Sequence, residues 1–533
     1  MMIDFSKKRF LVVDDFSEFR SSIRGILRLL AVQDIDTAAN GNEVLELCRR
    51  NRYDVILHDY NLGDGLNGQQ VLELLHAEKL LPPHCIFIMV TAENTQAMVL
   101  AALECQPDDY LTKPFNKVAL QTRLERLIRR KRVLKPVLDA KEANNPTGVL
   151  QACLAIEQQE PRHAVLCHTY MADALCELGR YKDLEQLLET QARSRPSSWN
   201  LQALARLWLR QGRLEQVNRL LNAAIRQFPM MPELHDIRAE LAALQNDFVG
   251  TLDALREAVA LSPNTLRRQI NLASQAWLSG DHRAAQLALR RCWEVARYAV
   301  SFDPELLWLQ ASILAQGSVE STQTRLPEDV EHWLNLTERA ARQTPKVQPA
   351  ATVLRLEEQR RKGHPPSSAD LSDLTAQLNE HKYEYSAITL LQLGDWLARF
   401  GETDAAEALW VFCAKRHAGT AMLLEHISTR CLALDLQPLA QALLDSRQAA
   451  ALHYQEQFDE AQALFTQALQ KTPELVELNM AAARLFSDQL TQQNTQAERA
   501  LNQCFQRINS LSTLEPDSAD FIRMQSALEL TPW

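Results

Sequence analysis

Residues 55–62 of this 533-residue chain read Val-Ile-Leu-His-Asp-Tyr-Asn-Leu, so a short apolar run ends at the carboxylate of Asp59. A run of this length, bounded by turn or helix-start residues, is typical of a buried strand in a parallel sheet. Three further polar signals also follow apolar runs: Asp14-Asp15, Thr91 and Lys113-Pro114. Ligands bind at the carboxyl edge of open parallel sheets. The sequence therefore predicts one polar site at that edge.

The residue types at this edge suit phosphoryl transfer. Asp14, Asp15 and Asp59 would repel one another in a poorly solvated crevice, so the site calls for a divalent cation with oxygen ligands, most naturally Mg2+. The cation would draw in a phosphoryl donor, and Asp59 would be the attacking carboxylate. Lys113 would pair with one phosphoryl oxygen and the Thr91 hydroxyl would donate to another. The expected product is an acyl phosphate on Asp59.

With these residues in this order, residues 1 to about 130 resemble the receiver domain of bacterial two-component response regulators. The resemblance implies a flavodoxin-like α/β domain with a five-stranded parallel sheet. It implies that Asp59 is the phosphoacceptor. It also implies that Asp15, Asp59 and the backbone carbonyl of Asn61 hold Mg2+, and that Asp14 reaches the metal through water.

The resemblance implies further roles around the site. Thr91 and Tyr110 would form the switch pair that responds to the phosphoryl group. Asn61 and Glu93 occupy the positions that tune the lifetime of that group. The Lys113–Pro114 peptide bond would be cis, as it is in the family.

Taken singly, each motif also has a structural explanation. Asp14-Asp15 is a suitable N-cap for a helix that starts near Ser17, Asp59 could be a turn residue, and Lys113 could be a solvated loop charge. Together, in this order and at the ends of strands, these signals favour a phosphorylation site. A receiver-shaped domain that is never phosphorylated is the remaining alternative.

Composition limits the classes of partner. The formal net charge is -10, and both the receiver and the remainder carry more acidic than basic side chains. Neither part has the basic excess that nucleic-acid binding needs. Ten cysteines occur without a Cys-x-x-Cys pair, so we expect no zinc site and no disulfide framework. No stretch approaches 18 uninterrupted apolar residues, and we expect a cytoplasmic protein without membrane contact.

A repeat dominates the chain after the receiver. Gly179, Gly212, Asn246 and Gly280 are separated by 33, 34 and 34 residues. An alanine lies seven residues before each of these turn residues: Ala172, Ala205, Ala239 and Ala273. A proline follows three of the units: Pro196, Pro229 and Pro263. Such a period predicts stacked helical hairpins, in which the turn residue permits a tight reversal and the alanine a close helix approach. The pattern resembles the tetratricopeptide repeat (TPR).

The same pattern returns late in the chain, and it divides the sequence. The later markers are Gly401, Ala406 and Trp410, then Phe458, Ala461, Phe465 and Pro473. Pro136, Asn144-Asn145 and Pro146 favour a linker before the first repeat. We therefore expect a receiver over 1–130, a linker over 131–148, TPR-like repeats over 149–300, an irregular helical segment over 301–385 and further repeats over 386–533. The second part would be an all-α helical-repeat superhelix, continuous or interrupted.

Nothing in residues 140–533 resembles a catalytic constellation, so we expect no enzyme activity beyond phosphoryl transfer to and hydrolysis from the protein's own aspartate. The expected function is that of a response regulator phosphorylated on Asp59 by a histidine kinase or phosphotransfer protein. Its output would be binding of an unidentified protein partner through the repeats. Two alternatives stay open: a phosphorylation-independent scaffold or decoy and, less favoured, a transcription factor with a cryptic DNA-binding motif. A homodimer is also open.

Overall fold

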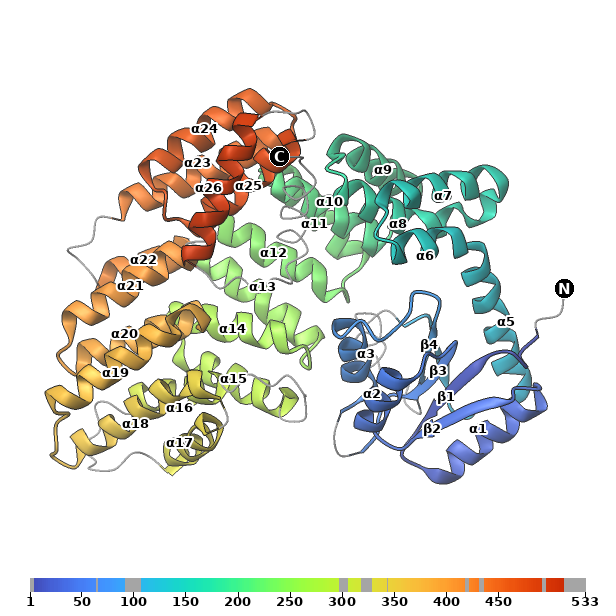
Figure 1. Ribbon diagram of the computed structural model, residues 1–533, viewed down its shortest axis with the longest axis horizontal. Helices are drawn as coiled ribbons and strands as arrows, with labels where there is room; N and C mark the ends of the chain where they lie inside the picture. The colour runs from blue at the N-terminus through green and yellow to red at the C-terminus, as the bar shows by residue number, and fades with distance from the viewer. Residues whose placement is uncertain are drawn as a thin grey trace. The chain divides into compact units, whose positions relative to one another are not determined.

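The chain begins with a parallel sheet flanked by helices and continues as helices alone, as Figure 1 shows for the computed structural model. The structure describes residues 4–63, 66–91, 107–296, 305–317, 328–342, 344–417, 421–430, 436–490 and 495–511. These residues divide into two compact units. The first is built on Met1–Pro196, and the second mainly on Ser197–Val295 and the residues that follow it.

Five parallel strands form the sheet of the first unit, in the order β2-β1-β3-β4-β5. The strands are β1 (Arg9–Val13), β2 (Asp34–Ala38), β3 (Val55–Asp59), β4 (Ile86–Thr91) and β5 (Asp109–Thr112). The register places Val13 opposite His58, and Asp59 opposite Val90. The carboxyl ends of β1, β3 and β4 therefore lie side by side. The predicted five-stranded parallel sheet is confirmed.

Helices cover both faces of the sheet. They are α1 (Ser17–Leu29), α2 (Gly41–Arg50), α3 (Gly68–Ala77) and α5 (Lys117–Val133). Apolar side chains of α1 and α5 pack with Val55 and Leu57 of β3 on one face. Those of α2 and α3 pack with Ile56 and Phe87 on the other. Alternate residues of β3 thus enter different cores, as the period of a strand requires.

The stretch expected to be a linker, residues 131–148, is helical. It holds the end of α5, all of α6 (Lys135–Glu142) and the start of α7 (Pro146–Gln159). Pro136 and Pro146 stand in the first turns of their helices, where the missing N–H has no intrahelical partner to lose. Val137 and Leu138 are buried. The structure thus corrects the expectation of a linker, because these prolines start helices.

The predicted hairpins are present where the period placed them. In the first unit, α8 (Ala164–Glu177) and α9 (Tyr181–Ser194) reverse at Gly179, whose φ is 69°. Gly212, Asn246 and Gly280 likewise have φ of 69°, 58° and 81°. These three residues join the helix pairs α10 (Ser198–Arg210) and α11 (Leu214–Gln227), α12 (Pro232–Leu244) and α13 (Phe248–Leu261), and α14 (Leu266–Leu278) and α15 (His282–Ala296). The four alanines of the pattern are buried, so the helical repeat is confirmed.

The later repeats follow the same design. Gly401, with φ of 94°, joins α20 (Ala387–Arg399) to α21 (Thr403–His417), and Glu456, with φ of 62°, joins α23 (Gln437–Tyr454) to α24 (Phe458–Lys471). The expected packing residues Ala406, Ala461 and Phe465 are fully buried. The remaining helices here are α22 (Ala421–Arg430), α25 (Val476–Leu490) and α26 (Thr495–Leu511).

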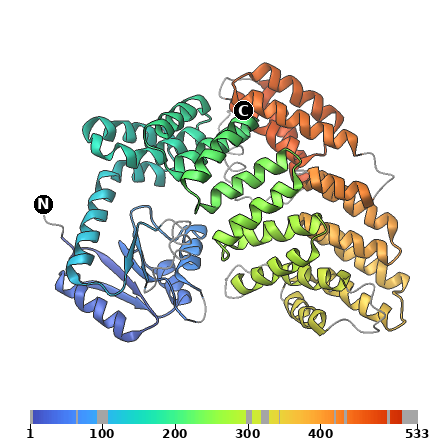
Figure 2. The ribbon, with the colours of Figure 1, turned by 180° about the vertical axis from the view of Figure 1, so that it is seen from behind.

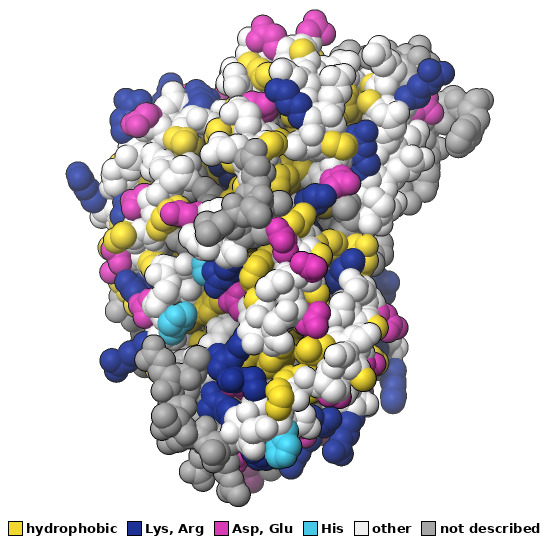
Figure 3. Space-filling view, turned by 90° about the vertical axis from the view of Figure 1, so that its left-hand side faces the viewer, with side chains coloured by type: hydrophobic (Ala, Val, Ile, Leu, Met, Phe, Trp, Pro, Cys, Tyr) yellow, Lys and Arg dark blue, Asp and Glu magenta, His cyan; other side chains and the backbone are white. Residues whose placement is uncertain are grey.

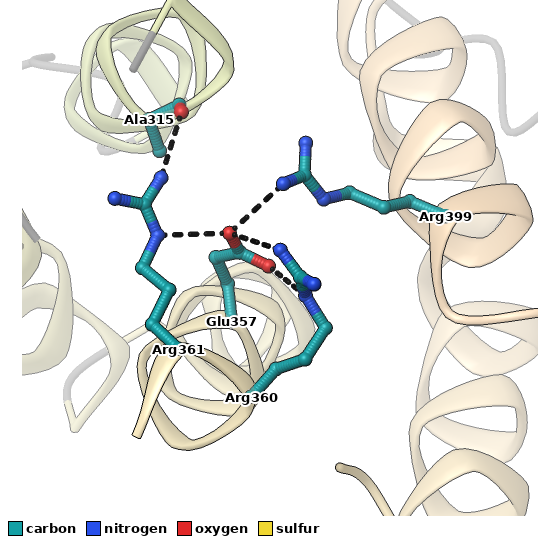
Figure 4. Close-up of polar contacts among 5 residues, drawn as sticks. All are labelled: Ala315, Glu357, Arg360, Arg361 and Arg399. Carbon is teal, nitrogen blue, oxygen red and sulfur yellow. Dashed lines mark hydrogen bonds and ion pairs between the residues drawn. The ribbon is translucent and has the colours of Figure 1, made fainter. Parts of the chain in front are cut away.

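The segment expected to be irregular, 301–385, forms regular helices wherever the structure describes it. They are α16 (Glu305–Gly317), α17 (Glu328–Ala341), α18 (Gln348–Arg361) and α19 (Ser368–His381), and α16 packs on α17 as α18 does on α19. A buried cluster around Glu357 joins α16, α18 and α20 (Figure 4). The repeat markers fail here because the glycine between α18 and α19, Gly363 with φ of 88°, lies off the 34-residue period.

Helices far apart in the chain meet inside the second unit. α12 and α14 contact α22, and α10 contacts α23, and Figure 2 shows these helices from behind. The rings of Trp277 on α14 and His426 on α22 lie 4.8 Å apart. The early and late repeats of this unit are therefore one packed body.

None of the helices that the structure describes is both long and apolar enough to cross a bilayer.

Candidate phosphorylation site

An acidic cluster lies where β1 and β3 end. Asp14 and Asp15 follow β1 directly, and Asp59 is the last residue of β3. One carboxylate oxygen from each of the three lies within 4.8 Å of the other two. The parallel register sets this arrangement, because it brings the end of β1 beside the end of β3.

Lys113 supplies the positive charge of the site. Its Nζ lies 2.6 Å from Asp14 Oδ2 and 2.9 Å from Asp59 Oδ2. The backbone N–H of Lys113 donates to the carbonyl of Thr91 at 2.7 Å, which fixes the turn after β5 against the end of β4. The Lys113–Pro114 peptide bond is cis, as the resemblance implied. The structure thus joins four of the predicted residues, Asp14, Asp15, Asp59 and Lys113, in one site.

The charges of this cluster do not balance. Burial raises the pKa of Asp59 to about 6; Lys113 acts to lower this pKa, while Asp14 and Asp15 act to raise it. Burial alone would lower the pKa of Lys113, but its hydrogen bonds to Asp14 and Asp59 outweigh that effect and the pKa is raised. Three carboxylates against one ammonium leave an excess of negative charge, which a divalent cation would neutralise.

Asp15 shows that the residues fit such a cation. Its Oδ1 is buried and has no hydrogen-bond partner among the residues that the structure describes. A buried carboxylate oxygen without a donor is unfavourable unless it binds a cation. Oxygen ligands in a carboxylate cluster are those that Mg2+ prefers. Asn61 follows β3 by two residues with its side chain exposed, and the metal-binding role of its carbonyl stays a prediction.

The alternative reading of Asp14-Asp15 as a helix N-cap does not describe the structure. The N-cap of α1 is Phe16, which makes no side-chain cap. Asp14 Oδ1 accepts the N–H of Phe16 at 2.9 Å, while Oδ2 pairs with Lys113. Asp14 therefore uses one oxygen to hold the turn before α1 and the other to hold the site lysine.

Three residues of the site were missed by sequence reasoning. Lys113 Nζ lies 4.1 Å from the ring centroid of Phe19, and the guanidinium of Arg20 donates to the carbonyls of Asp14 and Asp15. Both lie in the first turn of α1, at a spacing that brings a side chain back over the strand end. The third is His58, whose Nδ1 contacts the carbonyl oxygen of Asp59. The sequence pattern could not reveal this role of His58, because all residues of β3 are buried and none stands out by its periodicity.

The predicted switch residues lie on the two strands next to the cluster. In the β4–β5 pairing, Tyr110 stands opposite Met89 and Thr91 stands opposite Thr112. Tyr110 is half-buried and packs against the core on the α2 and α3 side of the sheet. Glu93, the second predicted lifetime residue, lies outside the described residues. The structure therefore places Thr91 and Tyr110 near the site, and their switching role stays a proposal.

The comparisons with known proteins agree with this geometry. The family pattern of the response regulator receiver domain matches residues 10–125. The chemotaxis protein CheY of Pseudomonas aeruginosa is 30% identical over 122 residues, which cover 23% of this chain and 97% of that protein. The chain belongs to the response regulator family. The chemotaxis protein CheY-3 of Vibrio cholerae is also similar to this response regulator, at 28% identity over 122 residues and 92% of its own length.

Two solved structures match different shares of this response regulator. The beryllofluoride-activated receiver domain of DrrB is 25% identical, with a TM-score of 0.21, and the match covers 23% of this chain and 97% of that one. A tetratricopeptide repeat protein from Parabacteroides merdae is 11% identical, with a TM-score of 0.31, over 56% of this chain and 98% of that one. The assignment of the second part as a TPR-like region rests on its own hairpins and their turn residues.

Proposed function

We propose that this response regulator accepts a phosphoryl group on Asp59 from a histidine kinase or phosphotransfer protein, in a reaction that needs Mg2+. Its output would be protein binding by the helical repeats. The observation that carries the proposal is the cluster of Asp14, Asp15 and Asp59 around Lys113 at the carboxyl edge of the sheet. Membership of the receiver family supports it.

Asp59 is the nucleophile in this proposal because the other two carboxylates serve other roles. Asp14 holds Phe16 with one oxygen and Lys113 with the other. Asp15 has the buried oxygen that fits a cation. An oxygen of Asp59 would give its lone pair to phosphorus. The bond from phosphorus to the donor's imidazole nitrogen would break, and its electron pair would return to the ring.

The remaining groups would balance charge and position the phosphoryl oxygens. Asp15, Asp59 and the Asn61 carbonyl would hold Mg2+ directly and Asp14 would hold it through water, and the bound cation would supply positive charge against the carboxylates and the phosphoryl group. Lys113 would turn from Asp59 to a phosphoryl oxygen, and the Thr91 hydroxyl would donate to another. Asn61 and Glu93 would set how fast water removes the group. Thr91 and Tyr110 would report its presence.

Output through protein contacts is supported by the surface of the helical part. Figure 3 looks onto the side of the second unit that lies at the left of Figure 1, and shows basic and acidic side chains interspersed over it. A mixed surface and a net charge of -10 suit a protein partner better than a polyanion. The cysteines that the structure describes are all free, which fits the cytoplasm as the proposed location.

Phosphorylation with a small donor tests the proposal. The protein is incubated with acetyl phosphate and Mg2+, and its intact mass is compared with that of Asp59→Asn treated in the same way. The proposal predicts the gain of one phosphoryl group in the wild type only, and its loss when Mg2+ is removed by a chelator.

Two outcomes would contradict it. Equal labelling of Asp59→Asn would place the phosphoryl group elsewhere. No labelling of the wild type, together with equal binding of a kinase by both proteins, would instead support the phosphorylation-independent scaffold.

A further inference from the structure

His58, the residue before the proposed phosphoacceptor, is fully buried. Its ring lies on the sheet face that α2 and α3 cover, where it stacks on Phe87 with the ring centroids 5.6 Å apart. Its Nε2 is buried and has no hydrogen-bond partner among the residues that the structure describes. A neutral imidazole carries one N–H, and the contacts of the ring show which nitrogen has it.

His58 Nδ1 lies 2.6 Å from the backbone carbonyl oxygen of Asp59. A carbonyl oxygen only accepts, so Nδ1 must carry the proton and donate it. The pairing of β1 with β3 ends at Val13 and His58, and the Asp59 carbonyl therefore lies past the last pair of that ladder. The imidazole supplies a donor at the point where the neighbouring strand stops.

Gly68 shows how tightly this hydrogen bond is enclosed. A Cβ atom at Gly68 would lie 2.7 Å from the Asp59 carbonyl oxygen and 3.1 Å from His58 Nδ1. The N–H of Gly68 in turn donates to the carbonyl of Tyr60 at 2.7 Å. Two successive carbonyls, those of Asp59 and Tyr60, are thus each held by one donor immediately before Asn61.

We infer that His58 is a positioning residue of the phosphorylation site: its Nδ1–H holds the Asp59 carbonyl and so fixes the backbone that leads from the phosphoacceptor to Asn61. This inference rests on the proposed function. Rotation of the peptide between Asp59 and Tyr60 would displace the Asp59 carboxylate and the Asn61 carbonyl together. Loss of the donor therefore weakens Mg2+ binding and slows phosphoryl acceptance at the same time. His58 itself does not need to touch the phosphoryl group.

A matched pair of variants isolates the donor. In His58→Asn the side-chain amide nitrogen is bonded to Cγ, as Nδ1 is in histidine, so this variant can still donate to the carbonyl. In His58→Leu a methyl group takes that place. Both variants lose the ring that stacks on Phe87, so a purely structural role predicts equal effects. Mg2+ affinity is measured by titration, and phosphoryl acceptance by the initial rate with acetyl phosphate at saturating Mg2+.

The inference predicts that His58→Leu binds Mg2+ about tenfold more weakly than His58→Asn, which is the size of effect that outer contacts of a metal site produce. The rate with acetyl phosphate should fall in the same order. Equal Mg2+ affinities and equal rates in the two variants would overturn the inference. If the wild type itself neither binds Mg2+ nor accepts a phosphoryl group, the proposed function has failed instead.

A second measurement does not depend on the variants folding. Long-range proton–nitrogen correlation spectra of the histidine-labelled wild type report which imidazole nitrogen is protonated. The inference predicts that the His58 ring carries its proton on Nδ1 and not on Nε2, with slow exchange against solvent. A proton on Nε2 would overturn it, because Nδ1 could then not donate to the Asp59 carbonyl.

Discussion

Asp59 carries a negative charge at a place where burial disfavours it. Its carboxylate is almost fully buried at the end of a central strand, and Lys113 compensates for only part of the surrounding acidic charge. A pKa shifted by burial and by neighbouring charges is common for a side chain that reacts. The raised pKa of Asp59 predicts how the stability of the receiver depends on pH and on Mg2+.

In the absence of Mg2+, Asp59→Asn should stabilise the receiver at neutral pH. The folded pKa of Asp59, about 6, lies above the unperturbed value of 3.8. The folded state therefore holds this proton more tightly than the unfolded state, and the contribution of Asp59 to stability falls as pH rises from about 4 to about 6. Amide hydrogen exchange in β1 and β3 should be slower in Asp59→Asn than in the wild type at pH 7, and similar in both at pH 4.

Mg2+ provides the control for this prediction, because the cation stabilises the ionised carboxylate. Saturating Mg2+ should slow exchange in the wild type more than in Asp59→Asn. Faster exchange in Asp59→Asn than in the wild type at pH 7 without Mg2+ would contradict the prediction that the charge of Asp59 destabilises the receiver.

The sequence predicted the reacting residues but not the groups that hold them. Asp14, Asp15, Asp59 and Lys113 were found because each ends an apolar run, and a parallel sheet brings such ends together. His58, Phe19 and Arg20 act through contacts across the fold, and neither their spacing nor their type marks them in the sequence. Single buried contacts of this kind become visible only when the strands and α1 are in place.

The cluster around Glu357 joins three helices. Glu357 is fully buried and accepts hydrogen bonds from Arg360, Arg361 and Arg399, and Arg361 also donates to the carbonyl of Ala315 (Figure 4). Arg360 and Arg361 lie in the last turn of α18 and Arg399 lies in the last turn of α20. Cations at helix C-termini also offset the helix dipoles there. One carboxylate thus allows three arginines to pack together.

Glu357→Gln should destabilise the second unit by about 3 kcal/mol, because it leaves buried guanidinium groups without their counter-charge. Urea unfolding followed by tryptophan emission measures this, since all nine tryptophans lie between Trp199 and Trp533. Burial acts to raise the pKa of Glu357, but the arginines outweigh it and lower the pKa. The stabilisation is therefore present above the unperturbed value of 4.5 and lost as pH falls through the lowered pKa.

Glu358→Gln on the same helix is the matched control. Glu358 pairs with Lys362 near the surface, where an ion pair contributes about 0.5 kcal/mol. Equal shifts in the urea midpoint for Glu357→Gln and Glu358→Gln would contradict the structural role of the buried cluster.

Gly394→Ala should also destabilise the second unit. Gly394 of α20 faces Trp410 of α21, and a Cβ atom at this glycine would collide with the indole ring. Overpacking of this kind costs about 1–3 kcal/mol. Gly25→Ala in α1 is the contrasting case, because no atom lies within 4 Å of its Cβ position and alanine favours a helix. Thermal unfolding that shifts in the same direction for both variants would contradict this packing.

The sequence located the hairpins better than the elements between them. Gly179, Gly212, Asn246 and Gly280 marked the turns because the close reversal needs a positive φ, which a sequence period can display. Pro136 predicts a linker because proline interrupts helices, but in the structure it lies in the first turn of α6. The helices over 305–381 were expected to be irregular because their turns lack the repeat spacing. In each case the packing of apolar side chains, such as Val137 and Leu138, decided the structure.

The division of the molecule into two units does not follow the repeat. The 34-residue period runs through the boundary between Pro196 and Ser197. The period reflects the geometry of single hairpins, whereas the division reflects which helices pack together. For this reason the sequence could predict the kind of architecture but not where its bodies separate. The first unit contains the receiver together with α6, α7, α8 and α9. A structural change in the receiver can therefore act on helices of the same unit.

The proposed function requires that a phosphoryl group on Asp59 controls the helical repeats. Titration with beryllofluoride, a phosphoryl mimic, in the presence of Mg2+ tests this requirement, with tryptophan emission as the readout and Asp59→Ala as the control. Because the receiver contains no tryptophan, a signal can come only from the part of the chain after it. We expect a saturable change in emission that Asp59→Ala lacks. No change, when receiver resonances confirm that the mimic has bound, would contradict it.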